Sequence, residues 1–453
     1  MPTPAAAVLL TALATAGSGV SAGAPGEAMS GPIPVELVRD ESGWRLLRGG
    51  EPYFVRGAGG RASYLHRLAE AGGNSFRTWG VADVAETRRM LDRAHELGMS
   101  VLVGLSLPKW RHFDYGDDAA VAGLLDAQLR NVEALKDHPA VLAWGVGNEV
   151  MLAEADGPEG AERCARFFTL LNAFAERVKA ADPHHPVATV IAGANGNEIA
   201  ALNEHAPGID LVGVNAYGGS TSLSDELRGH GLDRPFMLTE FGSEGFWVAE
   251  QTEWGAPIEP LSGDKAETFR RSYLDTVMSN PGWCLGSYAF LWGHKNERTA
   301  TWFSMILETG EKTEPVDVMT ELWTGCAPEN RCPRLRRIVS PADRARVAPG
   351  SRHEVRISAG DPDHDPLTYR VEVERLASEL GFGGSYEPRP ERMDVEITPV
   401  DADGRCTFVA PTEPGGYRLF VYVFDGRNGA ATGNFPFWVE ASEGAAETAA
   451  RER

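Results

Sequence analysis

Two glutamates in this sequence each end a mostly apolar run of the kind that forms buried strands. Glu149 ends the segment Trp144–Glu149 (WGVGNE), and Glu240 ends the segment Met237–Glu240 (MLTE). A carboxylate in such a place is costly unless it has partners and a purpose. Two carboxylates on either side of one glycosidic bond can cleave it, one as a general acid and the other as a nucleophile. This chemistry requires a fold that brings the two glutamates to one site.

The elements that must position these glutamates are strands that are each followed by a helix. Apolar runs alternate with amphipathic stretches of helical period from Tyr53 to Trp323. Strands are expected at Tyr53–Arg56, Ser75–Trp79, Ser100–Leu107, Val141–Asn148, Val187–Ala192, Leu211–Asn215, Phe236–Glu240 and Gly286–Trp292. Helices are expected at His66–Ala71, Val84–Leu97, Ala119–Asp137, Ala161–Ala181, Glu198–His205, Leu223–Gly229, Lys265–Ser279 and Pro315–Trp323. Eight such units over about 270 residues match an α/β fold of the (β/α)8 barrel type, which we place at residues 33–330.

A barrel of this type would bring the two glutamates together. Strands four and seven face each other across the barrel, and barrel enzymes place their active sites at the C-terminal ends of the strands. A doubly wound sheet would also alternate strands with helices, and Gly57–Gly60 (GAGG) resembles part of a dinucleotide fingerprint. The third glycine at the proper spacing is missing, which disfavours a dinucleotide cofactor.

The pattern changes after Trp323, where helical periodicity gives way to short alternating runs separated by turn residues. Strands are expected at Glu354–Ile357, Leu367–Val373, Met393–Ile397, Cys406–Val409, Tyr417–Phe424 and Phe435–Val439. This pattern predicts a small all-β sandwich of immunoglobulin-like type at residues 335–440. The polar, Ala/Glu-rich residues 441–453 are expected to form a flexible tail.

The ordered set of motifs resembles the clan A glycoside hydrolases. Asn148 and Glu149 close strand four, and Glu240 lies in the TEFG segment that closes strand seven. The barrel domain of glycoside hydrolase family two and related β-glucan-active enzymes is the most similar. The resemblance implies a retaining mechanism with Glu149 as acid/base and Glu240 as nucleophile. Family-two enzymes usually carry sandwich domains before the barrel, whereas here the sandwich follows it, so family two itself and its substrates are not implied.

The resemblance also implies residues that contact the substrate or the nucleophile. Arg77 on strand two would support the nucleophile, Asn148 would bond the sugar 2-hydroxyl, and Trp292 on strand eight would form a platform under the sugar. Tyr217 matches the strand-six position beside the nucleophile, and Asn215 lies in the same segment. Several tryptophans in or near predicted βα loops are candidates for stacking on sugar rings, among them Trp79, Trp247 and Trp254.

The sequence also allows other interpretations of these residues. Either glutamate could be an ordinary capping or salt-bridged acid, and Glu244 is an alternative nucleophile close to Glu240. The same site could transfer a glucanosyl unit to a sugar hydroxyl instead of water. Besides hydrolysis and transglycosylation, a third hypothesis is a non-catalytic glycan-binding protein. The carboxylate pair argues against it, because binding a neutral sugar does not require such a pair.

Composition narrows the class of partner. The 43 basic and 64 acidic residues give a net charge of −21, which disfavours nucleic acid and anionic membranes as partners. We expect a β-linked glucan or a related poly- or oligosaccharide as substrate, with no cofactor and no catalytic metal. The sequence makes no prediction of oligomeric state.

The first residues resemble a signal peptide. Ala5–Ala16 is an apolar run, and Val20–Ala22 is followed by small residues. We therefore expect a signal peptide at residues 1–22 and a secreted or periplasmic protein. No run in the sequence is expected to span a membrane.

Two further groups of side chains suggest a disulfide and a metal site, on weaker grounds. Cys326 and Cys332 flank the segment APENR and could form a disulfide in an oxidising compartment. Asp361, Asp363 and Asp365 lie in GDPDHDP, where carboxylates at such spacings can bind calcium, although a solvated turn is the commoner structure.

Overall fold

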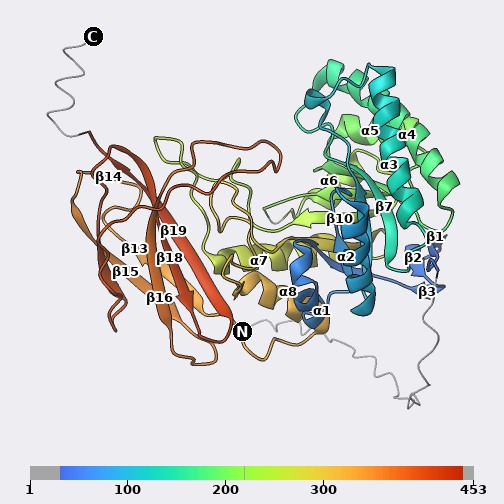
Figure 1. Ribbon diagram of the computed structural model, residues 1–453. Helices are drawn as coiled ribbons and strands as arrows, with labels where there is room; N and C mark the ends of the chain where they lie inside the picture. The colour runs from blue at the N-terminus through green and yellow to red at the C-terminus, as the bar shows by residue number, and fades with distance from the viewer. Residues whose placement is uncertain (1–30, 219, 442–453) are drawn as a thin grey trace, which may run out of the picture.

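The computed structural model describes residues 31–218 and 220–441 (Figure 1). Within them, eight parallel strands form a closed barrel in the order β4 to β11, with β11 returning to pair with β4. The barrel strands are β4 (Val55–Gly60), β5 (Ser75–Arg77), β6 (Ser100–Leu105), β7 (Val141–Asn148), β8 (Val187–Ala192), β9 (Leu211–Asn215), β10 (Phe236–Phe241) and β11 (Cys284–Trp292). The predicted (β/α)8 barrel is confirmed. The predicted signal peptide and residues 442–453 of the predicted tail lie outside the described residues.

Helices follow the barrel strands and surround them (Figure 1). They are α1 (Leu65–Glu70), α2 (Val84–Glu96), α3 (Asp118–Leu135), α4 (Gly157–Ala181), α5 (Gly196–His205), α6 (Leu223–Gly229), α7 (Ser262–Ser272) and α8 (Glu314–Thr324). The side chains of Asp83, Asp117 and Asn195 accept backbone hydrogen bonds at the starts of α2, α3 and α5. After α7 the chain continues as a π-helical turn at Tyr273–Met278, so the helix expected at Lys265–Ser279 is not one regular α-helix. No helix in the described ranges is long and apolar enough to cross a membrane.

A hairpin that the sequence analysis did not predict closes the amino end of the barrel. It consists of β1 (Val35–Asp40), β2 (Gly43–Arg48) and the short β3 (Glu51–Pro52). Val35 and Leu46 are buried in one cluster with residues of the barrel strands, including Leu102 and Met237. The amino end is therefore filled with apolar side chains, which leaves the carboxyl end for a site.

The C-terminal domain consists of two sheets. One contains β12 (Lys312–Thr313), β19 (Gly429–Val439), β18 (Gly415–Phe424) and β16 (Thr368–Arg375), with β14 (Arg346–Val347) paired to β19. The other contains β13 (Arg334–Val339), β15 (Arg352–Gly360) and β17 (Arg405–Val409). Their inner faces share a core that includes Val355, Phe408, Leu419 and Phe437. The predicted C-terminal β-domain is confirmed as two predominantly antiparallel sheets.

The strand expected at Met393–Ile397 is absent from the described structure. Arg392 forms an isolated bridge to Glu374 in one sheet, and Ile397 forms one to Phe408 in the other. The segment crosses from one sheet to the other, so its alternating apolar residues cover the edge of the core without pairing along a single strand.

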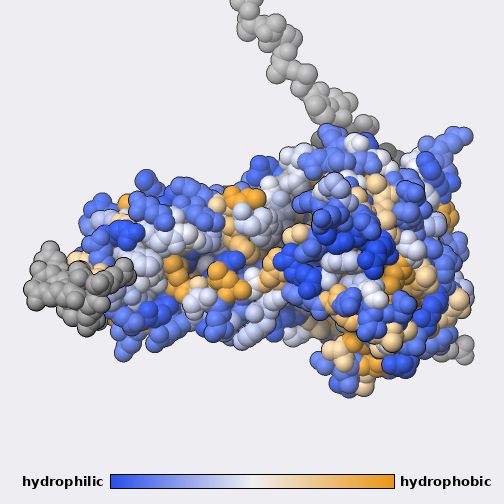
Figure 2. All heavy atoms as spheres, turned by 90° about the horizontal axis from the view of Figure 1, so that it is seen from above, coloured by the Kyte–Doolittle hydropathy of each residue, from blue (hydrophilic) through white to orange (hydrophobic). Residues whose placement is uncertain are grey.

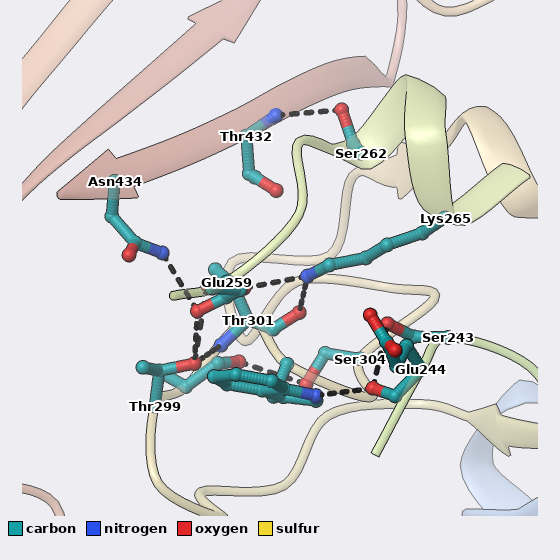
Figure 3. Close-up of polar contacts among 12 residues, drawn as sticks. Ser243, Glu244, Glu259, Ser262, Lys265, Thr299, Thr301, Ser304, Thr432 and Asn434 are labelled. Carbon is teal, nitrogen blue, oxygen red and sulfur yellow. Dashed lines mark hydrogen bonds and ion pairs between the residues drawn. The ribbon is translucent and has the colours of Figure 1, made fainter. Parts of the chain in front are cut away.

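The two domains form two lobes of one elongated molecule, with apolar surface patches where they meet (Figure 2). The short strand β12 leaves the barrel and pairs with β19 of the sandwich. Figure 3 shows a buried polar cluster at this junction, centred on the Glu259 carboxylate. Glu259 accepts hydrogen bonds from Lys265 at 2.5 Å and, across the domain boundary, from Asn434 at 2.7 Å. The Glu259 cluster therefore joins the two domains through hydrogen bonds of defined geometry, and Leu307 packs against Phe420 and Tyr422.

Neither the suggested disulfide nor the suggested calcium site is present in the described residues, and the aspartates lie in a turn, the structure given as the commoner one. Cys326 is an exposed free thiol and Cys332 a buried one, so the suggested disulfide is absent. Asp363 accepts two hydrogen bonds from the Arg331 guanidinium, at 3.0 and 2.6 Å, instead of converging with its neighbours. Among the described residues, no group of three or more His, Cys, Asp or Glu side chains could hold a metal ion.

Candidate active site

A cavity of about 880 Å³ opens at the carboxyl end of the barrel. Glu149, directly after β7, and Glu240, within β10, both line it. The carboxyl ends of other barrel strands, and the segments that follow them, complete the wall with Trp79, Ala192, Gly193, Ala216, Tyr217, Phe290 and Leu291. The topology thus brings together two carboxylates that are 91 positions apart in the chain.

The Glu240 carboxylate is held by three donors. Arg77 Nη1 and Trp79 Nε1 donate to Oε1 at 2.9 and 2.8 Å. Tyr217 donates its hydroxyl hydrogen to Oε2 at 2.6 Å. Glu240 is 6% exposed, so these donors and the Arg77 charge compensate a carboxylate that water scarcely reaches. The carboxylate is fixed in orientation and remains at the cavity wall.

The Tyr217 hydroxyl is kept in its protonated form. Burial raises the pKa of this phenol well above its ordinary value, and the negative charge of Glu240 raises it further. The ring packs against Trp247, Phe290 and Phe303, with ring centroids 5.6, 5.9 and 5.3 Å away. Tyr217 is therefore a rigid neutral donor to one oxygen of Glu240.

Glu149 has an unusual backbone conformation. Its φ is +50°, a left-handed value that costs a residue with a side chain of the order of 1 kcal/mol. Its backbone N–H donates to Val190 O at 2.8 Å. Its side chain accepts from Asn215 Nδ2 at 2.9 Å through Oε1 and from Lys109 Nζ at 3.1 Å through Oε2. Strain held by the surrounding structure is a feature of functional sites, and here it sets the direction of the carboxylate.

The two carboxylates belong to one hydrogen-bond network. Arg77 donates to Glu240 and, through Nη2, to Asn148 Oδ1 at 2.6 Å. Asn215 Nδ2 donates to the same oxygen of Asn148 at 3.1 Å and to Glu149. Because each side chain has two or more partners, the network fixes Glu149 and Glu240 relative to each other.

The structure brings most of the predicted site residues together. Arg77, Trp79, Asn148, Asn215 and Tyr217 all bond to one another or to the glutamates, as described above. Trp247 lines the cavity and is 55% exposed, as a stacking surface would be. Glu244, the alternative nucleophile, is exposed and does not line the cavity; its backbone oxygen accepts from Trp302 Nε1 at 2.8 Å.

Trp292 is not at the cavity. Its side chain is fully buried, its ring packs on Trp323 of α8, and its Nε1 donates to Tyr64 O at 3.2 Å. The prediction of a platform at this position is therefore wrong. Phe290 and Leu291, in the same strand, line the cavity instead.

Three features of the site were missed. Lys109 follows the third barrel strand in the segment LSLPKW, a position after a strand end that could have marked it. Glu198, in α5, is 3% exposed, and burial raises its pKa to about 8, with a further contribution from the charge of Glu149. The third feature is a glycine-rich segment of the C-terminal domain, Gly381–Gly384, which lines the cavity. Neither of the last two carries a sequence signal that points to the site.

The barrel is of the (β/α)8 type, an architecture that carries many different activities. A solved structure of similar fold is β-glucuronidase 2 of Bacteroides uniformis, with 14% identity and a TM-score of 0.49, covering 90% of this chain and 48% of that one. The β-D-glucuronidase of Dictyoglomus thermophilum has 17% identity and a TM-score of 0.48, over 64% of this chain and 54% of that one. The endo-1,4-β-mannanase of Eisenia fetida has 18% identity and a TM-score of 0.41, over 58% of this chain and 91% of that one.

The chain spans about half the length of the β-glucuronidases that it matches. No protein-family model matches the sequence, and no curated protein matches it. The identities and TM-scores of the structural matches are low. These matches therefore concern the fold alone.

Proposed function

We propose that this protein is a retaining β-glycoside hydrolase with Glu240 as nucleophile and Glu149 as acid/base. The observation that carries the proposal is the pairing of these side chains in one cavity, each with its own set of donors. Three neutral or cationic donors surround Glu240, as a nucleophilic carboxylate requires. Glu149 has instead one amide and one ammonium partner, Asn215 and Lys109, and reaches the same cavity from the facing strand.

The reaction would proceed in two displacements. Glu149 gives its proton to the glycosidic oxygen while Glu240 attacks the anomeric carbon, and the bond to the leaving sugar breaks. Water then attacks the anomeric carbon of the glycosyl-enzyme ester and transfers a proton to Glu149, which releases the Glu240 carboxylate. Arg77, Trp79 and Tyr217 hold Glu240 in both steps.

Asn148 supplies a group for the sugar itself. Its carbonyl oxygen accepts from Arg77 and Asn215, which fixes the orientation of the amide. The amide nitrogen has no acceptor among the residues that the structure describes. We propose that it donates to a hydroxyl of the bound sugar, a contact that can strengthen in the transition state.

We propose a β-linked glucan or related polysaccharide as the substrate class. The cavity is at the upper end of the usual size for a ligand site, and aromatic side chains including Trp79, Phe290 and Trp247 line it, with Trp247 presenting an exposed indole. An indole face offers the apolar surface on which a neutral sugar ring stacks. We also propose that the protein is exported after cleavage behind Ala22, which N-terminal sequencing of the extracytoplasmic protein would test.

The test is hydrolysis of β-glucans, β-mannans, β-galactans and aryl β-glycosides by the wild type, Glu240→Ala and Glu244→Ala. We expect Glu240→Ala to be inactive and azide to restore turnover of an activated aryl glycoside, with an α-glycosyl azide as product. Glu244→Ala, whose side chain is exposed outside the cavity, is the matched control and should keep its activity. Full activity of Glu240→Ala, or an inverted product anomer from the wild type, would contradict the proposal.

The same reactions separate the alternatives. Products longer than the substrate would indicate a transglycosylase on this site. Glycan binding without turnover of any substrate would indicate a non-catalytic protein.

A further inference from the structure

A segment of the C-terminal domain forms part of the wall of the catalytic cavity. The connection between β16 and β17 spans residues 376–404, and Gly381–Gly384 within it line the cavity together with residues of the barrel. We call Gly381–Glu387 the sandwich loop. The cavity that holds Glu149 and Glu240 is therefore built by both domains.

The sandwich loop presents an aromatic side chain to the cavity. Phe382 lines the cavity and is 37% exposed. The Arg111 guanidinium lies 4.2 Å from the centroid of its ring, and the His112 ring meets it edge-on at 6.4 Å. A phenyl ring that is supported by a cation and a second ring, yet remains partly open, is a preformed surface for stacking.

The sandwich loop lies on the side of the acid/base residue. A Cβ at Gly383 would lie 3.0 Å from Leu152 Cδ2 and 3.3 Å from Lys109 Cε, so the backbone there is close to both side chains. Lys109 donates to Glu149. The acid/base residue of a retaining glycosidase protonates the leaving-group oxygen, so this side of the cavity accommodates the leaving group.

The sandwich loop is held in place by the barrel. The Glu387 carboxylate is 2% exposed and accepts from Gly381 N at 2.8 Å and from Arg298 N of the barrel at 2.6 Å. Lys295 Nζ donates to Gly384 O at 2.8 Å. These bonds order the loop before any ligand binds, which lowers the entropy cost of using it as a binding surface.

We propose that the sandwich loop forms the leaving-group subsite, in which Phe382 stacks on the sugar ring that departs. This inference rests on the proposed glycosidase function and adds the residues that select the leaving group. It makes the C-terminal domain a part of the active site. A leaving group too small to reach Phe382 would gain nothing from the loop.

The experiment compares wild type, Phe382→Ala and Tyr386→Ala on two kinds of substrate. One kind is cellotetraose and laminaritetraose; the other is β-glucosyl and β-cellobiosyl fluoride, whose leaving group is fluoride. Tyr386 is the matched control, because it lies in the same loop, is 87% exposed and does not line the catalytic cavity. We expect Phe382→Ala to lower kcat/KM for the tetrasaccharides about tenfold, because one stacking contact between the phenyl ring and a sugar is lost. The kcat/KM for the glycosyl fluorides should not change. Tyr386→Ala should change neither.

The failure of this inference can be told apart from the failure of the proposed function. An active wild type with equal effects of Phe382→Ala on both kinds of substrate, or with no effect on either, overturns the leaving-group subsite alone. If the wild type cleaves neither kind, the proposed hydrolase function fails, and tetrasaccharide binding by the same variants becomes the readout. A several-fold weaker Kd for Phe382→Ala than for Tyr386→Ala would then support the stacking surface, and equal Kd values would overturn it.

Discussion

Replacing Glu198 with glutamine should make the protein less sensitive to rising pH. Glu198 is 3% exposed, and its carboxyl group makes no hydrogen bond to any described residue. Burial raises its pKa from the ordinary value of 4.5 to about 8, with further contributions from the charges of Glu149 and Asp156, while Lys109 acts in the opposite direction. The folded protein therefore binds this proton more tightly than the unfolded chain does. The stability contributed by the protonated form is complete below about pH 4.5 and is lost as the pH rises to about 8.

The size of the effect follows from the two pKa values. At 1.36 kcal/mol per pKa unit, the difference between 4.5 and about 8 corresponds to a ceiling of about 5 kcal/mol. Between about pH 5 and pH 9, the contribution to the free energy of unfolding is about 4 kcal/mol. Glutamine does not titrate, so Glu198→Gln should lose that much less stability than the wild type over this range.

Guanidinium unfolding at about pH 5, 7 and 9, followed by tryptophan fluorescence, measures this difference. Comparing the change with pH in each protein cancels the constant cost of burying an amide and the titration of other groups. Glu204→Gln is the matched control, because Glu204 lies on the same helix with 76% of its side chain exposed, and it should follow the wild type. Parallel pH dependences for Glu198→Gln and the wild type would refute the reasoning.

Three further outcomes are expected. Tyr217→Phe removes a charge-assisted hydrogen bond to Glu240 and should lower kcat/KM about 10- to 100-fold without changing the circular dichroism spectrum. Glu387→Ala removes the acceptor of Gly381 N in the sandwich loop and of Arg298 N in the barrel, and it should speed proteolysis within the loop and raise KM for tetrasaccharides several-fold, while kcat/KM for glycosyl fluorides stays constant. Glu259→Gln leaves the buried Lys265 without its counter-ion and should destabilise the protein by about 3 kcal/mol, measured as a lower unfolding midpoint.

The fold could be predicted because the barrel repeats one unit with a clear pattern. The strands at Val141–Asn148, Val187–Ala192 and Leu211–Asn215 match the structure residue for residue. The N-terminal hairpin was missed because its strands Val35–Asp40 and Gly43–Arg48 carry several exposed charged residues and little apolar alternation.

The site residues that could be predicted are polar or charged side chains at the ends of strands. Arg77, Asn148 and Glu240 occupy such places, and the structure joins them in one network. Trp292 was misplaced because every residue of β11 is buried, and a strand buried on both faces has no alternation that tells which side chains point to the cavity. Its indole instead faces Trp323 in the helix layer.

What could not be predicted depends on contacts between distant segments. Glu198 has the sequence context of an ordinary helical glutamate, and only the packing of α5 against the barrel places it near Glu149. Phe382 lies 233 positions after Glu149 in a stretch without strands, between turn-forming glycines. Neither burial nor proximity to the cavity is encoded in the local pattern of these residues.

The contacts between the domains bear on whether the sandwich is a separate glycan-binding module. The sheet that contains β19 takes one of its strands, β12, from the barrel segment. Arg298 N of the barrel donates a hydrogen bond to Glu387, which orders the sandwich loop. Asn434 of the sandwich also supplies one of the donors to the buried Glu259. A fragment containing only residues 335–453 would lack strand β12, the hydrogen bond from Arg298 to Glu387, and the contact of Arg111 with Phe382. The structure therefore indicates that the sandwich loop depends on the barrel for its order, so the isolated fragment should lack this surface.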